Sequence, residues 1–253
     1  MAQRVSYRAL GGPEVLELEH LEFPAPDADE VQVRVLAVGM NRFDALMRRN
    51  HYVIPPVLPS AMGNEAVGTV TAIGSTVNHV ALGDRVAILP IVSPIMGTGT
   101  YATHATVPAR AVVQSIPYLS DVEEAGLWMA ALQAWNMVAR HQLPSEAWVL
   151  ITAATSPVGH MALQIAKDLG LRAIGTTRRA EQSESLRISG AAEVIVTRRT
   201  GDLVEAVARF TGGKGVELVI DAVGGPLFAE CVSATAQGGH IIAYGAQTSP
   251  DFK

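Results

Sequence analysis

The chain has 253 residues and a net charge of −5, from 19 Lys and Arg against 24 Asp and Glu. Hydrophobic residues make up 49% of it, which excludes disorder, and the length allows one or two domains at ~150 residues each. The negative charge argues against nucleic acid as the main ligand, because phosphate binding needs a basic surface. The single cysteine, Cys231, excludes an internal disulfide and a multi-cysteine metal site.

Targeting signals are not expected. The N-terminus lacks the apolar segment of a signal peptide, and the richest apolar run, residues 86–92, is short and contains Pro90. A membrane span needs ~20 apolar residues. We therefore predict a cytoplasmic protein that binds a small-molecule substrate, with no nucleic-acid or membrane partner.

The first part of the chain, up to about residue 120, predicts β-structure. Residues 30–39 alternate apolar and polar, with Val31, Val33 and Val35 on one face, as in a half-buried strand. Residues 68–74 and 84–89 predict further strands, separated by turn glycines. Such a series of short strands is typical of a small barrel or sandwich.

The second part alternates strands and helices. Residues 148–154 form a continuous apolar run, as in a strand buried on both faces, and an apolar stripe predicts a helix from about Val158 to Gly170. Asp202 and Glu205 have capping-box spacing at the start of another predicted helix. Further strands are predicted at 173–177, 193–197, 217–223 and 240–244, and helices at 180–188 and 202–210. This order predicts an α/β fold with a parallel sheet.

A loop of small residues, Ala153 to Gly159, joins the first of these strands to its helix. Small residues give a dinucleotide's pyrophosphate close access to the backbone at a helix N-terminus. Ser156 and Pro157 stand at glycine-type positions, so the loop departs from a strict G-x-G-x-x-G. Taken alone, it leaves a plain strand–helix turn open.

The end of the second strand indicates which dinucleotide binds. It reads Thr176, Thr177, Arg178, Arg179, where an NAD-binding protein carries an acidic residue for the ribose hydroxyls. Arginine instead offers a permanent charge and several donors to a 2′-phosphate. We therefore predict NADPH as the cofactor, with a solvated basic turn as the alternative.

Ordered motifs along the whole chain resemble one known superfamily. They lie at residues 11–18, 39–44, 63–68, 83–86, 99–102, 153–159, 212–216, 221–225 and 244–245. In them the chain resembles the medium-chain dehydrogenase/reductase superfamily, and within it the zinc-free quinone oxidoreductase (zeta-crystallin-like) and enoyl reductase branch. The resemblance is specific for the superfamily and much less so for the substrate.

This resemblance implies the domain organisation. We expect a GroES-like β-barrel domain for substrate and catalysis at residues 1–120, and a Rossmann NADP(H)-binding domain at 121–253. Relatives continue beyond the last residues of this chain, so we expect a C-terminal truncation that leaves the Rossmann sheet without its last strand. Whether the early end is natural, and whether identical chains associate into a homo-oligomer, stays open.

The resemblance also bears on zinc. Zinc-dependent alcohol dehydrogenases of this superfamily bind the catalytic metal with a Cys near Asn41 and a His near Asn64, and amides are poor zinc ligands. Glu65 alone is not a metal site, and His51, His79 and His104 lack ligand spacing. We therefore predict no metal.

Two residues are predicted to be catalytic. Tyr52 has the spacing to Asn64 and Glu65 seen in enoyl reductases, in which the equivalent tyrosine is regarded as the proton donor; a structural role covering the Pro-rich loop is the alternative. The resemblance places Asn41 near the nicotinamide ribose or the substrate. Asp44, three residues after Asn41, is as readily explained as a residue that caps or braces the helix.

The predicted cofactor-binding residues come from the loop, the strand ends and the resemblance. They are Asn41, Gln133, Thr155, Ser156, Pro157, Val158, Gly159, Thr177, Arg178, Val223, Gly224, Tyr244 and Gly245. Gln133 replaces a Thr of the relatives, and Gln182 replaces a Lys that contacts the 2′-phosphate. For the last four of the cofactor set, ordinary turn residues are the alternative.

The sequence thus predicts an NADPH-dependent, zinc-independent oxidoreductase that transfers hydride to an α,β-unsaturated carbonyl (an enoyl or enone) or to a quinone. The alternative is a truncated family member that binds a ligand, or catalyses a non-redox cyclase or isomerase reaction, in the same cleft. An accessory role belongs to that alternative. The Gln133 and Gln182 departures favour it, and the expected early end of the chain favours it most.

Overall fold

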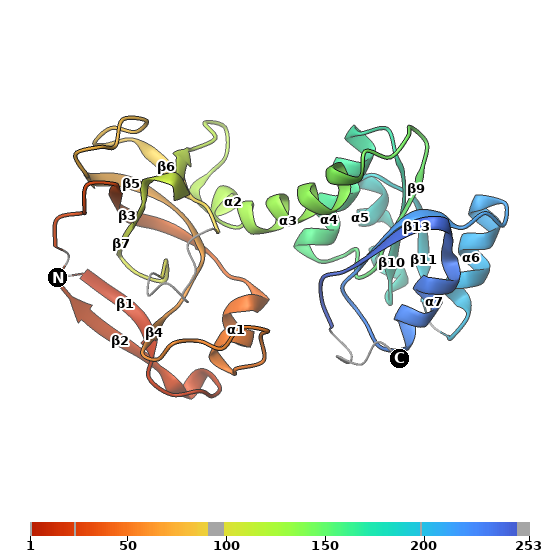
Figure 1. The fold of residues 1–253 in the computed structure, drawn as a ribbon, viewed down its shortest axis with the longest axis horizontal. Helices are drawn as coiled ribbons and strands as arrows, with labels where there is room; N and C mark the ends of the chain where they lie inside the picture. The colour runs from red at the N-terminus through yellow and green to blue at the C-terminus, as the bar shows by residue number, and fades with distance from the viewer. Residues whose placement is uncertain (1, 23, 91–98, 198, 247–253) are drawn as a thin grey trace. The chain divides into compact units, whose positions relative to one another are not determined.

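The computed structural model describes residues 2–22, 24–90, 99–197 and 199–246 (Figure 1). Contacts divide the chain into two compact units, unit 1 (Met1–Met129) and unit 2 (Ala130–Lys253). The predicted domain boundary at residues 120 and 121 lies at Ser120, the N-cap of helix α2. The predictions made on the last residues of the chain lie outside the described residues.

The described part of unit 1 is mainly β-structure, in two sheets with strand orders β2-β1-β4 and β7-β3-β5-β6-β8. Its helices are short. The strands are β1 (Ala2–Tyr7), β2 (Leu16–Leu21), β3 (Glu30–Gly39), β4 (Ser60–Ala61), β5 (Glu65–Ile73), β6 (Arg85–Ile88), β7 (His104–Pro108) and β8 (Val112–Gln114), and the helices are α1 (Arg42–Arg48) and α2 (Asp121–Ala125), with 3₁₀ turns at Pro13–Val15 and Ala109–Ala111.

The core of unit 1 follows from the predicted alternation. Val31 and Val33 of β3 are fully buried, whereas Arg34, the next residue of the same strand, is exposed. They pack with Ala66 and Val70 of β5 and with apolar residues of β6, β7 and β8 in one cluster. The strand predicted at residues 30–39 is therefore confirmed.

Unit 2 alternates strands and helices. Within its described residues the strands form one parallel sheet of order β11-β10-β9-β12-β13, so the chain order reverses beside β9. The elements are β9 (Trp148–Ile151), α4 (Pro157–Asp168), β10 (Arg172–Thr177), α5 (Ser183–Ile188), β11 (Ala191–Val196), α6 (Asp202–Thr211), β12 (Val216–Asp221), α7 (Pro226–Ala234) and β13 (Thr235–Ala243), preceded by α3 (Trp128–Val138), with 3₁₀ turns at Ala139–His141 and Ala180–Gln182.

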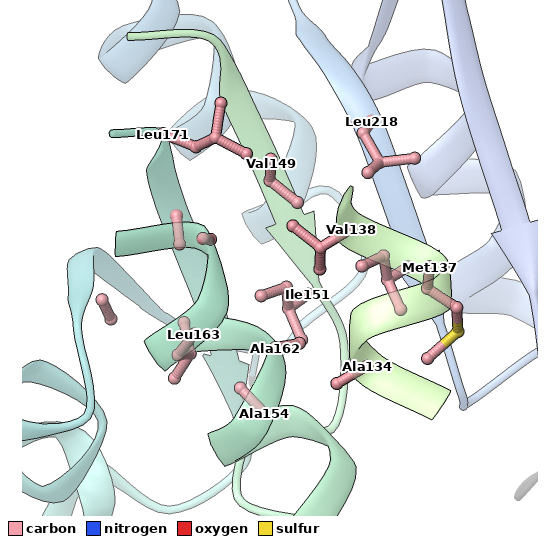
Figure 2. Packing of buried hydrophobic residues seen from close by; sticks show 14 of the residues in the cluster. Ala134, Met137, Val138, Val149, Ile151, Ala154, Ala162, Leu163, Leu171 and Leu218 are labelled. Atoms are coloured by element: carbon pink, nitrogen blue, oxygen red, sulfur yellow. The ribbon is translucent and has the colours of Figure 1, made fainter. Parts of the chain in front are cut away.

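Helices cover both faces of this sheet. On one face α3, α4 and α5 pack against Val149 and Ile151 of β9, and Figure 2 shows Ala134, Ala162 and Leu163 around them. On the other face α6 and α7 pack against the alternate β9 residues Trp148 and Leu150. β9 is therefore buried on both sides, which explains its continuous apolar run.

Several predicted elements differ from the observed ones in their ends. The prediction of a capping box at Asp202 and Glu205 is wrong: Gly201, in a left-handed conformation, is the N-cap of α6, and Asp202 is already the first helical residue. The carboxylate of Asp202 instead accepts the Arg199 amide at 2.8 Å. The helix predicted over 180–188 is a 3₁₀ turn followed by α5, and α7 was not predicted.

None of the helices in the described residues is both long enough and apolar enough to cross a membrane.

Candidate functional site

Each unit contributes a group of the predicted residues, and each group is described by itself. In unit 1, Asn41 is the N-cap of α1, and Asp44 occupies the third helical position. The Asp44 Oδ2 atom accepts the main-chain N–H of Asn41 at 2.8 Å, as in the returning half of a capping box. The predicted bracing role of Asp44 is therefore confirmed.

Asp44 also connects the helix to a neighbouring loop. Its two carboxylate oxygens accept the Asn64 amide at 3.0 Å and the Tyr101 hydroxyl at 2.8 Å. Asp44 is 4% exposed and Asn64 is 2% exposed, so water has little access to these bonds. All of these donors suit an ionised carboxylate, which can only accept.

A second buried carboxylate, Glu65, holds the side chain of Asn41. Glu65 Oε1 accepts Asn41 Nδ2 at 2.8 Å, and Glu65 Oε2 accepts the main-chain N–H of Met129 at 2.7 Å. Met129 lies in the first turn of α3, where the amides have no partner within the helix. Glu65 therefore fixes the Asn41 amide and the start of α3 together.

Two glycines leave room for these carboxylates. A Cβ on Gly39 would lie 2.4 Å from Glu65 Oε1 and 2.2 Å from the Ala125 oxygen. A Cβ on Gly63 would lie 2.4 Å from the Tyr101 ring, and Gly63 has a φ of +92°. A larger residue would displace the Glu65 carboxylate at position 39 and the Tyr101 ring at position 63.

Burial controls the electrostatics of unit 1. It raises the pKa of Asp44 and of Glu65 above their usual values, although the hydrogen bonds from Asn41 and the other donors oppose it. The charge of Asp44 raises the pKa of Glu65 further. Burial, followed by the charge of Asp44, raises the pKa of Tyr101 as well, which keeps that phenol protonated as a donor.

Tyr52 lies beside the same helix. Its ring makes an edge-on contact with Phe43 in the first turn of α1, with centroids 4.7 Å apart. Tyr52 remains 40% exposed. The neighbouring apolar side chains Val53 and Val57 are also exposed.

In unit 2, the predicted nucleotide loop leads from β9 into α4. Ser156 is the N-cap of α4, its Oγ accepts the Gly159 amide at 3.1 Å, and Pro157 is the first helical residue. A Cβ on Gly159 would lie 2.5 Å from the Ala154 oxygen. The glycine is thus required by the close approach of the helix to the strand, as in dinucleotide-binding loops.

The Ser-Pro pair changes which amides the loop can offer. Pro157 has no N–H to offer. The Gly159 N–H donates to Ser156 Oγ, and the His160 N–H donates to the main-chain oxygen of Ser156 at 2.9 Å. In this first turn, the main-chain N–H of Val158 could therefore donate to a pyrophosphate oxygen. Thr155, which precedes the cap and is half-buried, carries a hydroxyl beside it.

The end of β10 presents one cation without an acidic neighbour. Arg178 is exposed and forms no ion pair within the described part of the chain, whereas Arg179 lies 3.9 Å from Glu181. The buried Thr177 hydroxyl donates to Gln182 Oε1 at 2.9 Å. Gln182 therefore lies beside the predicted phosphate-binding turn, already engaged by Thr177.

The end of β12 is organised by a fully buried carboxylate. Asp221 accepts the Thr152 hydroxyl at 2.6 Å and the amides of Val223 and Gly224 at 3.0 and 2.9 Å. It thereby fixes the turn in which the predicted cofactor residues Val223 and Gly224 lie. Asp221 was not predicted, although its place at the end of an apolar strand could have suggested it.

The remaining predicted residues lie at the same edge of the sheet or on α3. The Tyr244 amide donates to the main-chain oxygen of Asp221 at 2.9 Å, and burial raises the pKa of the Tyr244 phenol. A Cβ on Gly245 would lie 2.9 Å from the Ala222 oxygen. Gln133 lies on α3 and is exposed.

Comparison with known proteins agrees with this architecture. A family model described as a zinc-binding dehydrogenase matches residues 157–252, and one described as an alcohol dehydrogenase GroES-like domain matches residues 27–118. Quinone oxidoreductase 1 of Escherichia coli strain K12 is 33% identical over 248 residues, which cover 97% of this chain and 73% of that protein. This chain belongs to the medium-chain dehydrogenase/reductase superfamily.

Solved structures of the superfamily superpose on most of the chain. That of Escherichia coli quinone oxidoreductase complexed with NADPH is 29% identical with a TM-score of 0.85, covering 98% of this chain and 74% of that one. A structure described as an NAD-dependent alcohol dehydrogenase is 32% identical with a TM-score of 0.91, covering 99% and 79%. The predicted fold, a GroES-like domain followed by a parallel Rossmann sheet, is confirmed.

For this superfamily member, the structure brings the predicted residues into two groups. Asn41 and Tyr52 both adjoin the first turn of α1, and the loop, Thr177 and Tyr244 lie at or beside the carboxyl ends of the sheet strands. The buried partners of these residues were not predicted, Glu65, Tyr101 and Asp221 among them. For Asp221 the signal in the sequence was a carboxylate at the end of an apolar strand, and for Glu65 a carboxylate at the start of one.

Proposed function

We propose that the chain is an NADPH-dependent oxidoreductase that reduces a quinone or an α,β-unsaturated carbonyl without zinc. The observation that carries the proposal is the β9–α4 loop together with Arg178. Gly159 supports close packing of helix on strand, and Arg178 is an exposed cation at the strand end where the adenine ribose is expected.

The residues of unit 2 fit NADPH. Arg178 would hold the 2′-phosphate as a charged donor, and the Val158 amide with the Thr155 hydroxyl would hold the pyrophosphate. Val223, Gly224, Tyr244 and Gly245 would contact the nicotinamide half, with Gln133 from α3. The related quinone oxidoreductase solved with NADPH supports this cofactor.

NADPH supplies the hydride when it is bound, and the reduced substrate then needs a proton. Tyr52, which is 40% exposed, would give that proton from its hydroxyl, because a phenol can act as donor near neutral pH. Asn41 would accept a hydroxyl of the ribose or the substrate through its amide oxygen. Delocalisation in an enone or quinone spreads the negative charge, so these two residues suffice without a Lewis acid.

The donor set of unit 1 does not fit a catalytic zinc. The side chains at the two metal positions of zinc-dependent relatives are the amides of Asn41 and Asn64, and both amide nitrogens are bound to carboxylates. Zinc prefers thiolate and imidazole ligands. We therefore derive no step through a metal.

Exposed apolar side chains support an apolar substrate. Tyr52, Val53, Ile54, Val57 and Leu58 are 40% to 88% exposed in one loop after α1. Burying such side chains against a ligand is favourable by ~25 cal/mol per Å² of apolar surface. This favours quinones and enoyl compounds over small polar carbonyls.

The alternative is a protein that binds a ligand, or catalyses a non-redox reaction, in the same site. The relatives reported above are named as quinone oxidoreductases and as an alcohol dehydrogenase, which favours the redox reaction. A cytoplasmic location also remains a prediction from the sequence.

The test is a fluorescence titration with NADPH and with NADH, followed by turnover on a panel of quinones and enones in the presence of a chelator. We expect tighter binding of NADPH and chelator-resistant oxidation. Binding without oxidation would support the alternative, and preference for NADH would remove the role of Arg178. Loss of activity in chelator that zinc restores would refute the metal-free reaction.

A further inference from the structure

We propose that Glu65 is a positioning residue for this reaction: its carboxylate fixes the Asn41 side chain so that Asn41 offers its oxygen, and not its nitrogen, to a hydroxyl of the cofactor or substrate. The inference rests on the proposed function, in which Asn41 touches one of these ligands. It adds a residue that itself touches neither.

The state of Glu65 follows from its partners. Glu65 is 1% exposed, and each of its oxygens accepts an N–H, from Asn41 Nδ2 at 2.8 Å and from the Met129 amide at 2.7 Å. Neither donor can take a proton from Glu65, so the arrangement suits the ionised carboxylate. The start of α3 favours the same charge, because the N-terminus of a helix carries a partial positive charge.

The orientation of Asn41 follows from the charge of Glu65. Rotating the Asn41 amide by half a turn would place Oδ1 against Glu65 Oε1, and two acceptors would then face each other without a proton between them. The nitrogen is therefore held on the side of Glu65, and the oxygen is held on the other side. Oδ1 also faces the main-chain N–H of Asp44 in the capping box of α1. An amide oxygen has two lone pairs, so Oδ1 can still accept a ligand hydroxyl with the second one.

The other carboxylate has a different task. Asp44 bonds the main-chain amide of Asn41 and the side chains of Asn64 and Tyr101, which fixes where α1 begins. Asn41 is thus held by Asp44 at its backbone and by Glu65 at its side chain. A Cβ on residue 39 would lie 2.4 Å from Glu65 Oε1. Because residue 39 is a glycine, Glu65 has the space for this contact.

Glu65 also bonds the first turn of α3. Met129, whose amide it accepts, lies in the same helix as Gln133, one turn before it. A loss of the Glu65 carboxylate would therefore release both the Asn41 amide and the first turn of α3. The two effects can be separated, because only the first one passes through the Asn41 side chain.

The experiment is a double-mutant cycle on kcat/KM with NADPH, using Glu65→Gln, Asn41→Ala and the double variant. Gln at 65 puts an NH₂ against one of the two N–H donors. We expect Glu65→Gln to lower kcat/KM by about 10-fold, the loss expected for a broken charge-assisted hydrogen bond, and to add less than about 2-fold once Asn41 is Ala. Losses that multiply, or an unchanged kcat/KM for Glu65→Gln, would overturn the proposal.

Thr100→Val is the matched control. Thr100 is buried and its hydroxyl donates to the main-chain oxygen of Glu65 at 3.0 Å, so this variant removes a buried hydrogen bond of the same residue without touching its carboxylate. We expect it to change thermal stability and to leave kcat/KM within about 2-fold, because the Glu65 carboxylate keeps both of its donors. If Glu65→Gln does not fold, Glu65→Asp tests the same contact with a carboxylate one methylene shorter.

A readout independent of turnover separates this proposal from the proposed function. In protein labelled with ¹⁵N-asparagine, the Asn41 side-chain signal is the one lost in Asn41→Ala. We expect slow solvent exchange of this NH₂ in the wild type, faster exchange in Glu65→Gln, and no change in Thr100→Val. An Asn41 signal that Glu65→Gln leaves unaltered would refute the positioning role, whereas a normal signal in a protein that oxidises no NADPH would refute the proposed function alone.

Discussion

The two units hold their polar residues in opposite ways. In unit 1 the buried carboxylates Asp44 and Glu65 are satisfied by protein donors, which fixes Asn41 before any ligand arrives. In unit 2 the Ser156 cap and Asp221 satisfy the backbone, while Arg178 is left exposed and without an acidic partner among the described residues. The Asn41 side chain of unit 1 is therefore preorganised, whereas the Arg178 charge of unit 2 is exposed to solvent.

The largest expected effect concerns Tyr52 in unit 1. Tyr52→Phe keeps the ring contact with Phe43 and removes only the hydroxyl. We expect kcat to fall by ~100-fold, the lower end for loss of a general acid, with no change in NADPH affinity. Steady-state kinetics measures both, with the exposed Tyr118→Phe as control. Unchanged turnover would leave Tyr52 with only a structural role, packing over the Pro-rich loop.

Gly159 tests the packing of the nucleotide loop. Gly159→Ala places a Cβ 2.5 Å from the Ala154 oxygen, a backbone atom that cannot easily move. We expect the free energy of unfolding to fall by ~1–3 kcal/mol and NADPH binding to weaken with it. Denaturant unfolding and a fluorescence titration measure these changes. Gly126→Ala is the control, because nothing lies within 4 Å of its added Cβ; equal effects in both variants would dismiss the close approach.

Arg178 tests the open charge of unit 2. Arg178→Gln should weaken NADPH binding by ~10-fold, because a hydrogen bond to a charged group contributes at least ~1.5 kcal/mol, and should leave NADH binding unchanged. Arg179→Gln, whose parent arginine lies 3.9 Å from Glu181, serves as control. Gln182→Lys should strengthen NADPH binding by adding a second cation. Equal losses for both cofactors would place Arg178 away from the 2′-phosphate.

Tyr101 tests the preorganised network of unit 1. Tyr101→Phe removes the hydrogen bond to Asp44 Oδ2 and leaves a buried acceptor with one donor fewer. We expect the free energy of unfolding to fall by ~1 kcal/mol, with NADPH affinity unchanged. Urea unfolding measures the first quantity and titration the second. A loss of NADPH affinity without a loss of stability would contradict the division of tasks between the units.

The smallest expected effect is a dependence of stability on pH. Burial raises the pKa of Asp44 in the folded protein, so the folded state holds this proton to higher pH than the unfolded chain does. Its contribution is fully present below the ordinary Asp pKa of ~3.9 and is lost as the pH rises through the folded pKa. Asp84 and Glu123, whose pKa values are lowered, contribute in the opposite direction.

The contribution of Asp44 is isolated by difference. We expect the free energy of unfolding of Asp44→Asn, measured in urea from about pH 4 upward, to lack the part of the decline that Asp44 causes. Asp84→Asn removes a carboxylate of the other kind and should alter the slope in the opposite sense. Parallel curves for wild type and Asp44→Asn would show that Asp44 does not titrate in this range.

Much of the fold could be predicted because it depends on periodicity. The alternation in β3, the apolar run of β9 and the stripe of α4 each report burial directly, and Gly159 and Arg178 stand at fixed places in a strand–helix–strand unit. Helix α7 could not be predicted in this way. Its N-cap, Gly225, has no capping side chain, and Pro226 at its first position was a helix-start signal that the prediction did not use.

The candidate site was predicted less completely because its geometry depends on distant partners. Glu65 and Met129 are 64 residues apart, and Thr152 and Asp221 are 69 apart, so no local pattern links them. Ser156 and Pro157 read as a departure from a glycine-rich loop. The structure gives the reason: they form the N-cap and the first residue of α4, which uses the amides that glycines would have left open.

The proposed function depends on hydride transfer from NADPH without a metal. The direct test uses NADPH deuterated at C4 of the nicotinamide, metal-stripped protein in chelator, and a quinone and an enone as acceptors, with mass spectrometry of the reduced enone. We expect deuterium at the β-carbon of the product and oxidation of NADPH with both acceptors. A product without deuterium, or transfer that occurs only after zinc is added, would contradict it.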